Sequence, residues 1–284
     1  MADEPAPQLV MVAGPNGSGK STLIATLRAT PDVHLPAQYI NADDIQRQEN
    51  LTPQAAQATA TLRRETTIAK RESLMYETVM SHPSKVAELQ TAAKRGYEAT
   101  VLFIATNNPE LNAARVADRV AHGGHDVPRE VITPRYNRTL GLAPSALQYA
   151  SKAVVFDNSS LDGIQAQAEL VDGRLEMRTE TPARWVSDLA AKVNERANEV
   201  EGIQTAHASK GVALRIPNLQ NDAIEGKMIY TTKNFALQLT ANAEMYLHDK
   251  ALLKGEPELN QVYEVKYSEG VATLGQVRQR DRER

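Results

Sequence analysis

A glycine-rich loop near the start of the chain has the residue types of a phosphate-binding site. Its members are Gly14, Pro15, Asn16, Gly17, Ser18, Gly19, Lys20, Ser21 and Thr22, directly after the apolar run 9–13. The glycines let backbone N–H groups surround phosphate oxygens, and the helix that follows adds its positive dipole. Lys20 is expected to reach the outer phosphates and Ser21 to ligate Mg²⁺. The loop therefore predicts binding of ATP or GTP with Mg²⁺.

Carboxylates follow the next two predicted strands of the chain. Asp43 and Asp44 follow the first of them, and Glu77 and Thr78 follow the second. Ligands of a parallel sheet bind beyond the carboxyl ends of its strands, so these residues are expected beside the loop. Asp43 is the candidate base that takes the proton of an attacking hydroxyl, but it could equally cap a helix, a role better suited to Asp44. Glu77 and Thr78 are candidate substrate residues, although Glu77 could also hold a magnesium-bound water or be a surface carboxylate.

Two arginines are spaced to face one ligand. Arg115 and Arg119 stand four residues apart in a predicted helix, so both could neutralise a triphosphate, unless they only form a solvated face. Two glycines before His125 permit a sharp reversal within the segment 107–140, which has the position of a lid and makes His125 a candidate substrate residue. Asp157 resembles a Walker B carboxylate, but a turn residue at a strand end is as good an interpretation.

Short apolar runs alternate with helical patterns in the first half of the chain, which is typical of βαβ units. We predict an α/β fold of the P-loop kinase type, with a parallel sheet flanked by helices, plus a small C-terminal β-rich module. Asp172 and Gly173 predict a hairpin at the sheet edge, and an apolar stripe predicts a helix from residue 182. The expected organisation is a domain over 1–202, a linker over 203–224, the module over 225–275 and a disordered tail over 276–284.

The composition narrows the possible partners. With 32 basic and 35 acidic side chains the formal charge is −3, so no global field attracts nucleic acid or anionic membranes. The absence of cysteine excludes disulfides and thiolate chemistry. Neither a signal-peptide pattern nor a long apolar run stands in the sequence, so we expect a cytoplasmic protein without membrane contact.

The motifs together resemble the zeta-toxin kinases of bacterial toxin–antitoxin systems, over residues 8–160. The matching segments are 14–22, 40–43, 76–78 and 115–128, the last of which reads RVADRVAHGGHDVP. The resemblance implies that UDP-N-acetylglucosamine is the substrate that is phosphorylated and that an antitoxin protein is a partner. It makes Asp43 the base, Lys20 the phosphate clamp, Glu77 a sugar-site carboxylate and Arg119 the lid arginine.

One position departs from that family pattern. Where the family has a second arginine, this chain has Gly124 and His125, so the second phosphate contact stays open between His125, Arg115 and Arg129. The acceptor stays open with it. The alternatives are a nucleotide or polynucleotide kinase, or a partner-binding protein switched by a nucleoside triphosphate.

The C-terminal module resembles the KfrB-like domain of conjugative-plasmid proteins. Residues 226–275 contain five lysines, no arginine and six acidic residues, which is not the charge of a nucleic-acid surface. We therefore expect the module to contact protein or to regulate the enzyme.

Overall fold

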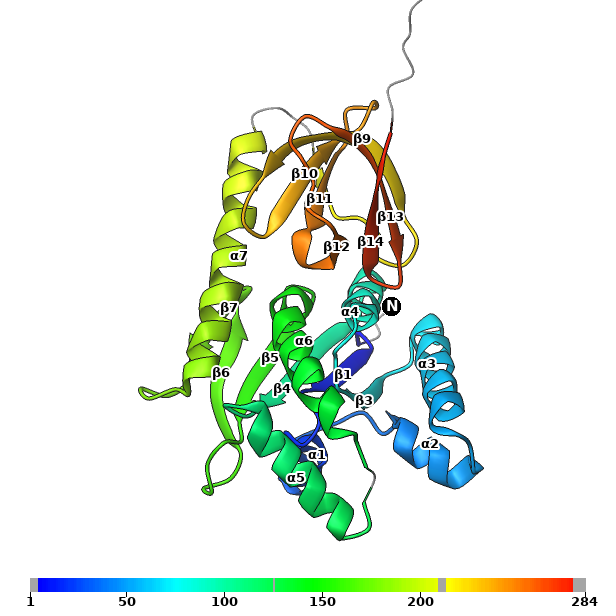
Figure 1. Cartoon of the computed structure of the whole chain (residues 1–284), viewed down its shortest axis with the longest axis vertical. Helices are drawn as coiled ribbons and strands as arrows, with labels where there is room; N and C mark the ends of the chain where they lie inside the picture. Colours follow the sequence, from blue (N-terminus) through cyan, green and yellow to red (C-terminus); the bar gives the residue numbers. More distant parts are fainter. Residues whose placement is uncertain (1–4, 125, 209–212, 278–284) are drawn as a thin grey trace, which may run out of the picture.

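The computed structural model describes residues 5–124, 126–208 and 213–277. Figure 1 shows an α/β lobe formed by the first part of the chain and a β-rich lobe formed by the last part. The long helix α7 (Arg184–Ala208) runs along the sides of both lobes. No helix in the described ranges is long and apolar enough to cross a membrane.

The first lobe contains a seven-stranded sheet, in which the first five positions are parallel. Its order is β2 (Tyr39–Ile40), β3 (Leu74–Thr78), β1 (Gln8–Ala13), β4 (Glu98–Ala105), β5 (Lys152–Asp157), β6 (Gln165–Val171) and β7 (Arg174–Met177). β6 and β7 form the expected antiparallel hairpin at the edge. The carboxyl ends of β1, β2 and β3 therefore meet at one edge of the sheet.

Within the described residues, six further helices belong to this lobe. They are α1 (Lys20–Ala29), α2 (Ala42–Glu49), α3 (Pro53–Lys70), α4 (Ser84–Lys94), α5 (Pro109–Ala121) and α6 (Arg129–Leu147). α3 begins after Thr52, whose hydroxyl accepts a hydrogen bond from the Ala55 N–H, and Pro53 occupies its first turn, a pattern that the sequence itself predicts. α6 continues seven residues beyond the lid segment 107–140 expected from the sequence, because its later residues are buried in the core.

The alternation of β1 explains how the sheet is buried on both faces. Leu9 and Met11 point into one core cluster, while Val10 and Val12 point into another that also holds Leu23 of α1. All four β1 side chains are buried, as expected for a central parallel strand. The strand thus holds the loop at its carboxyl end on a rigid support.

The second lobe is a curled seven-stranded sheet, which agrees with the expected β-rich module (Figure 1). Its order is β12 (Leu253–Lys254), β14 (Val271–Gln276), β13 (Val262–Ser268), β9 (Ala223–Thr231), β10 (Phe235–Leu239), β11 (Met245–Asp249) and β8 (Leu214–Arg215). His248 is fully buried there, and its two ring nitrogens contact Tyr267 Oη and Gln238 Oε1 at 2.8 and 2.9 Å. Burial lowers the pKa of His248 to about 3, so the ring is neutral.

The expected linker over 203–224 is wrong for the residues described. α7 continues to Ala208, and Leu219 is buried. The Gln90 amide of α4 donates to the Pro217 carbonyl at 2.7 Å and accepts from the Leu219 N–H at 2.9 Å. The backbone of this segment is therefore hydrogen-bonded to the first lobe. Residues 278–284 of the expected tail lie outside the described residues.

A buried ion pair also fastens the lobes together. Arg196 of α7 donates to the Asp249 carboxylate of β11 at 2.6 Å, and both side chains are about 5% exposed or less. The same guanidinium stacks on the Phe235 ring, 4.6 Å from its centre. The module is thus packed against the first lobe through α4 and α7.

Candidate active site

The phosphate loop turns between β1 and α1 with little space for side chains. A Cβ at Gly14 would lie 1.9 Å from the Ile104 carbonyl oxygen, and one at Gly17 would lie 2.5 Å from the Asn112 carbonyl oxygen. Gly17 also has φ +73°, which favours glycine. The nine loop residues of the sequence analysis thus lie together at the carboxyl end of β1, and Gly19 precedes the first turn of α1.

Lys20 lies in a cleft of about 770 Å³ beside this loop. Its Nζ donates to the carbonyl oxygens of Gly14 and Pro15, both at 2.9 Å. Burial lowers the pKa of Lys20 to about 8, opposed by the Glu77 carboxylate and supported by the Arg119 charge. An anion in the cleft would favour the charged form of Lys20.

Glu77 lies next to the candidate magnesium ligand Ser21. The Ser21 hydroxyl donates to Glu77 Oε2 at 3.2 Å, and the Asn41 amide donates to Glu77 Oε1 at 2.7 Å. Hydroxyl and carboxylate oxygens are the donors that Mg²⁺ prefers, so these residues fit that ion. The structure therefore places Glu77 on the phosphate side of the cleft, at the last-but-one residue of β3.

Asn41, rather than Asp44, caps α2. Its Oδ1 accepts from the backbone N–H groups of Asp43 and Asp44 at 2.7 and 3.3 Å. The Asp44 carboxylate instead pairs with Arg47, one turn along the helix. The expected cap by Asp44 is wrong, because the asparagine one position before the helix has the extended backbone that a cap requires.

Asp43 is left exposed in the first turn of α2, and it lines the cleft together with Lys20. The cap at Asn41 also rules out the capping role for the Asp43 side chain. Within the residues described, neither a hydrogen bond nor an ion pair occupies its carboxylate. This acid is thus available to a ligand in the cleft.

Both candidate arginines of α5 line the cleft. Arg115 donates to the Asn158 carbonyl at 2.7 Å, and the Asn158 side-chain amide donates to the Ser18 carbonyl at 2.9 Å. Arg119 lies near enough to lower the pKa of Lys20. α5 is also fixed to the loop by Asn112, whose amide donates to the Asn16 carbonyl at 2.6 Å.

The two other candidates for the second phosphate contact are His125 and Arg129. His125 lies outside the described residues. Arg129 begins α6 but is not among the described residues that line the cleft, whereas Arg135 of the same helix is. Of the two described candidates, Arg115 lines the cleft and is linked to the loop through Asn158, whereas Arg129 does not line the cleft.

Asp157 is the last residue of β5, and its carboxylate holds the turn that follows the strand. It is buried, and its carboxylate accepts from the Ser159 N–H and hydroxyl at 3.1 and 2.6 Å. The Trp185 indole N–H donates to the same carboxylate at 2.6 Å. The turn after β5 and the first turn of α7 thus occupy the side chain, which leaves the Walker B interpretation as the less favoured one.

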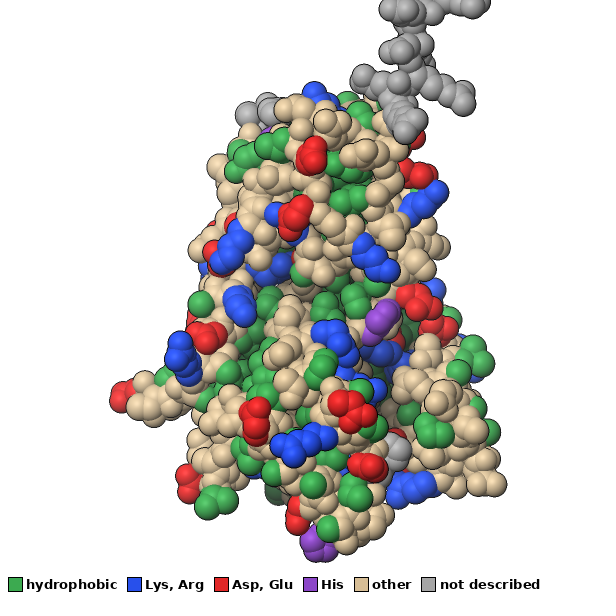
Figure 2. Space-filling view, viewed as in Figure 1, with side chains coloured by type: hydrophobic (Ala, Val, Ile, Leu, Met, Phe, Trp, Pro, Cys, Tyr) green, Lys and Arg blue, Asp and Glu red, His purple; other side chains and the backbone are tan. Residues whose placement is uncertain are grey.

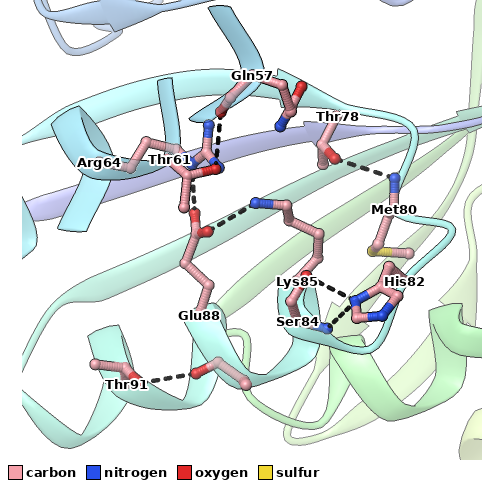
Figure 3. Close-up of polar contacts among 11 residues, drawn as sticks. Gln57, Thr61, Arg64, Thr78, Met80, His82, Ser84, Lys85, Glu88 and Thr91 are labelled. Carbon is pink, nitrogen blue, oxygen red and sulfur yellow. Dashed lines mark hydrogen bonds and ion pairs between the residues drawn. The ribbon is translucent and has the colours of Figure 1, made fainter. Parts of the chain in front are cut away.

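The far end of the cleft is built by α3, α4 and the loop after β3 (Figure 3). Arg64 Nε and Lys85 Nζ donate to the two oxygens of Glu88 at 2.9 and 2.8 Å, and all three side chains are buried or nearly so. Burial lowers the pKa of Lys85. Burial alone would raise the pKa of Glu88, but the charges of Lys85 and Arg64 outweigh this effect and lower that pKa. Thr78, predicted as a substrate residue, accepts from the Met80 N–H at 3.1 Å.

The described lining of the cleft holds more cations than carboxylates. Arg64 and Lys85 share the Glu88 carboxylate, and Glu65 also lies near enough to Lys85 to raise its pKa. Figure 2 shows Lys and Arg side chains gathered between α6 and α3, below the end of β14. Sequence reasoning missed these residues because Arg64 and Glu88 are 24 positions apart and match no motif. The cleft therefore has a phosphate loop at one end and excess positive charge at the other.

Comparison with known proteins identifies the family of the chain. Residues 1–158, more than half of the chain, match the family model of the zeta toxin, and residues 223–276 match that of the KfrB domain. The chain therefore belongs to the zeta toxin family, with the fold of a P-loop kinase. The two resemblances inferred from the sequence are confirmed.

Individual relatives are distant. An uncharacterized protein of Haemophilus influenzae is 26% identical over 127 residues, 45% of this chain and 91% of that protein. The crystal structure of AvrRxo1-ORF1:AvrRxo1-ORF2 with sulphate ions is 13% identical at a TM-score of 0.50, covering 66% of this chain and 65% of its own. The PezAT toxin–antitoxin system of Streptococcus pneumoniae has 14% identity and a TM-score of 0.44, with 69% and 88% covered. This chain thus spans just under two thirds of the AvrRxo1 chain, and the structural likeness concerns the fold.

Proposed function

We propose that the protein is a kinase that transfers the γ-phosphoryl group of ATP or GTP to a hydroxyl of a nucleotide sugar such as UDP-N-acetylglucosamine. The observation that carries the proposal is the uncommitted carboxylate of Asp43 in the same cleft as Lys20. A kinase needs an acid–base group on the acceptor side, whereas a nucleotide switch needs only a group that positions water.

The donor side would use the loop and the first turn of α1. Ser21 would hold Mg²⁺, with Glu77 and Asn41 fixing the surroundings of its hydroxyl. When bound, the ion neutralises the β- and γ-phosphates. Lys20 can exchange its two carbonyl acceptors for phosphate oxygens, to which its ammonium donates charge-assisted hydrogen bonds.

On the acceptor side, the proton of the acceptor hydroxyl would pass to the Asp43 carboxylate while the hydroxyl oxygen bonds to the γ-phosphorus. The bond from that phosphorus to the β–γ bridging oxygen then breaks, and the nucleoside diphosphate leaves. Arg119 and Lys20 would neutralise charge on the equatorial and leaving oxygens, a role that is electrostatic and requires no rearrangement during transfer.

The biological role follows from the same proposal. Family membership supports a toxin that depletes a nucleotide-sugar pool in the cytoplasm and that an antitoxin protein restrains. Expression in a wall-building bacterium should then arrest growth with accumulation of a phosphorylated nucleotide sugar, and the Lys20→Ala form should be harmless.

The test compares two neighbouring acids. Asp43→Asn keeps the shape of the side chain but removes the proton acceptor, so kcat with UDP-N-acetylglucosamine should fall by about 10²–10⁴ while ATP affinity stays the same. Asp44→Asn is the matched control, because its carboxylate is paired with Arg47 at the surface, and it should keep wild-type turnover. Equal activity of wild type and Asp43→Asn would refute Asp43 as the base.

A further inference from the structure

The far end of the catalytic cleft is lined by one stretch of chain between β3 and α4. Residues 78–82, Ser84 and Lys85 all belong to the cleft lining, and we call the stretch 78–85 the far wall. In Figure 3 the far wall turns from Thr78 past Met80 and His82 into α4. The shape of this side of the cleft therefore depends on how the far wall is held.

The backbone of the far wall is strained at one position. Met80 has φ +55°, in the left-handed region that residues other than glycine rarely adopt, and its side chain is 1% exposed. Such a backbone persists only where neighbouring contacts hold it. The Thr78 hydroxyl accepts from the Met80 N–H at 3.1 Å, and the Thr139 hydroxyl of α6 contacts the Val79 carbonyl at 2.8 Å. These contacts within the first lobe hold the first half of the far wall.

The C-terminal module supports the second half. Gly270, in the turn between β13 and β14, has φ +81°, and a Cβ there would lie 2.2 Å from the Pro83 carbonyl oxygen. This carbonyl also accepts from the Val86 N–H at 2.9 Å, at the start of α4. The turn is fixed in its own lobe, since the Gly270 N–H donates to the Leu219 carbonyl at 2.8 Å. Figure 1 shows the turn beside α4, so the module rests directly on the far wall.

The module holds α4 at a second point as well. The Gln90 amide lies about two helical turns after Pro83 and bonds to the backbone at Pro217 and Leu219. Leu219 is also the residue that fixes the turn at Gly270. One small unit of the module therefore sets both the position of the start of α4 and the direction of the helix.

We propose that the C-terminal module is a positioning element of the enzyme, which holds the far wall where the acceptor hydroxyl is presented to Asp43. The inference rests on the proposed function for the identity of the acceptor. Gly270 and Gln90 are described residues outside the cleft lining, so they act through the far wall and α4. The phosphate loop is held by Asn112 and Asn158 of the first lobe, so the module acts on the acceptor side and not on the donor side.

The test places a methyl group at the contact in the full chain. In Gly270→Ala the Pro83 oxygen and the new Cβ must separate by about 1 Å to reach an ordinary contact, and kcat/KM for UDP-N-acetylglucosamine should fall by about 10- to 100-fold. The Kd of ATP, measured by calorimetry without acceptor, should change by less than about twofold because the loop lies away from the contact. Gly173→Ala is the matched control. Gly173 has φ +76° with nothing within 4 Å of its Cβ position, so this variant adds backbone strain without a contact and should keep wild-type kinetics.

A second measurement does not depend on the acceptor. Amide hydrogen exchange over residues 79–88 should be faster in Gly270→Ala than in the wild type and Gly173→Ala, while residues 9–29 exchange at the wild-type rate. Gln90→Met removes both hydrogen bonds of α4 to the module without adding a clash, and it should show the same pattern. It takes the place of Gly270→Ala if that variant does not fold.

Three results would overturn the inference. They are unchanged exchange over residues 79–88 in these variants, unchanged kcat/KM, and a loss of ATP affinity as large as the loss of kcat/KM. Faster exchange over residues 79–88, together with a wild type that does not phosphorylate UDP-N-acetylglucosamine, would support the module as the support of the far wall and refute the proposed acceptor instead.

Discussion

Raising the pH from 7 to 9 should weaken ATP binding about tenfold, because Lys20 loses its proton in this interval. Burial lowers the pKa of Lys20 to about 8. About nine tenths of the side chains are then protonated at pH 7 and about one tenth at pH 9. Only the ammonium form balances phosphate charge, so affinity should follow the protonated fraction.

The sign of this linkage can be measured directly. The lowered pKa means that the unliganded fold bears a cost for the buried ammonium below pH 8, and the cost disappears as the pH rises toward the ordinary value of 10.5. A bound phosphate restores a partner and raises the pKa again. ATP binding at pH 8.5 should therefore take up protons, which calorimetry detects in buffers of different ionisation enthalpy.

A variant without the amine identifies the source of the pH dependence. Lys20→Met should bind ATP weakly and equally at pH 7 and pH 9, without proton uptake. The reasoning is refuted if wild-type affinity is the same at both values, or if Lys20→Met shows the same slope as the wild type.

Two further predictions concern stability. Asp157→Ala should lower the free energy of unfolding by about 3 kcal/mol, because it leaves the Trp185 indole N–H and the Ser159 turn without an acceptor, yet kcat should stay within about twofold; a lost kcat in a stable variant would restore the Walker B interpretation. Arg196→Met leaves the Asp249 carboxylate buried without its partner and should cost about 3–5 kcal/mol in urea unfolding, and an unchanged midpoint would show that the pair does not fasten the lobes.

Local signals allowed much of the fold to be predicted. The central strands are apolar runs, and the start of α3 is marked by Thr52 and Pro53, so neighbouring residues decide them. The hairpin at Asp172 and Gly173 was predicted for the same reason. The segment 203–224 was interpreted wrongly, since its polar composition hides backbone contacts with Gln90 that are distant in sequence.

The site shows the same limit. The phosphate loop has a spacing pattern of its own, and the position of Asp43 in the cleft was expected from the carboxyl end of β2. Asparagine and aspartate both cap helices well, so the choice of Asn41 over Asp44 depends on the backbone at the helix start. The bridge that Asn158 forms between Arg115 and Ser18 could not be predicted, because these residues lie 43 and 140 positions from Asn158 in the sequence.

The contact of Gln90 with the chain at Pro217 and Leu219 limits how the two lobes could be recombined. One side-chain amide imitates a strand partner, giving and receiving a hydrogen bond with a passing backbone. An engineered chimera that joins a different C-terminal module to this kinase lobe would have to offer backbone groups in the same register. It would also need a glycine at the position of Gly270, where a Cβ would lie 2.2 Å from the Pro83 carbonyl oxygen. A matching pair of positions, rather than a flexible tether, would therefore decide whether a hybrid enzyme folds.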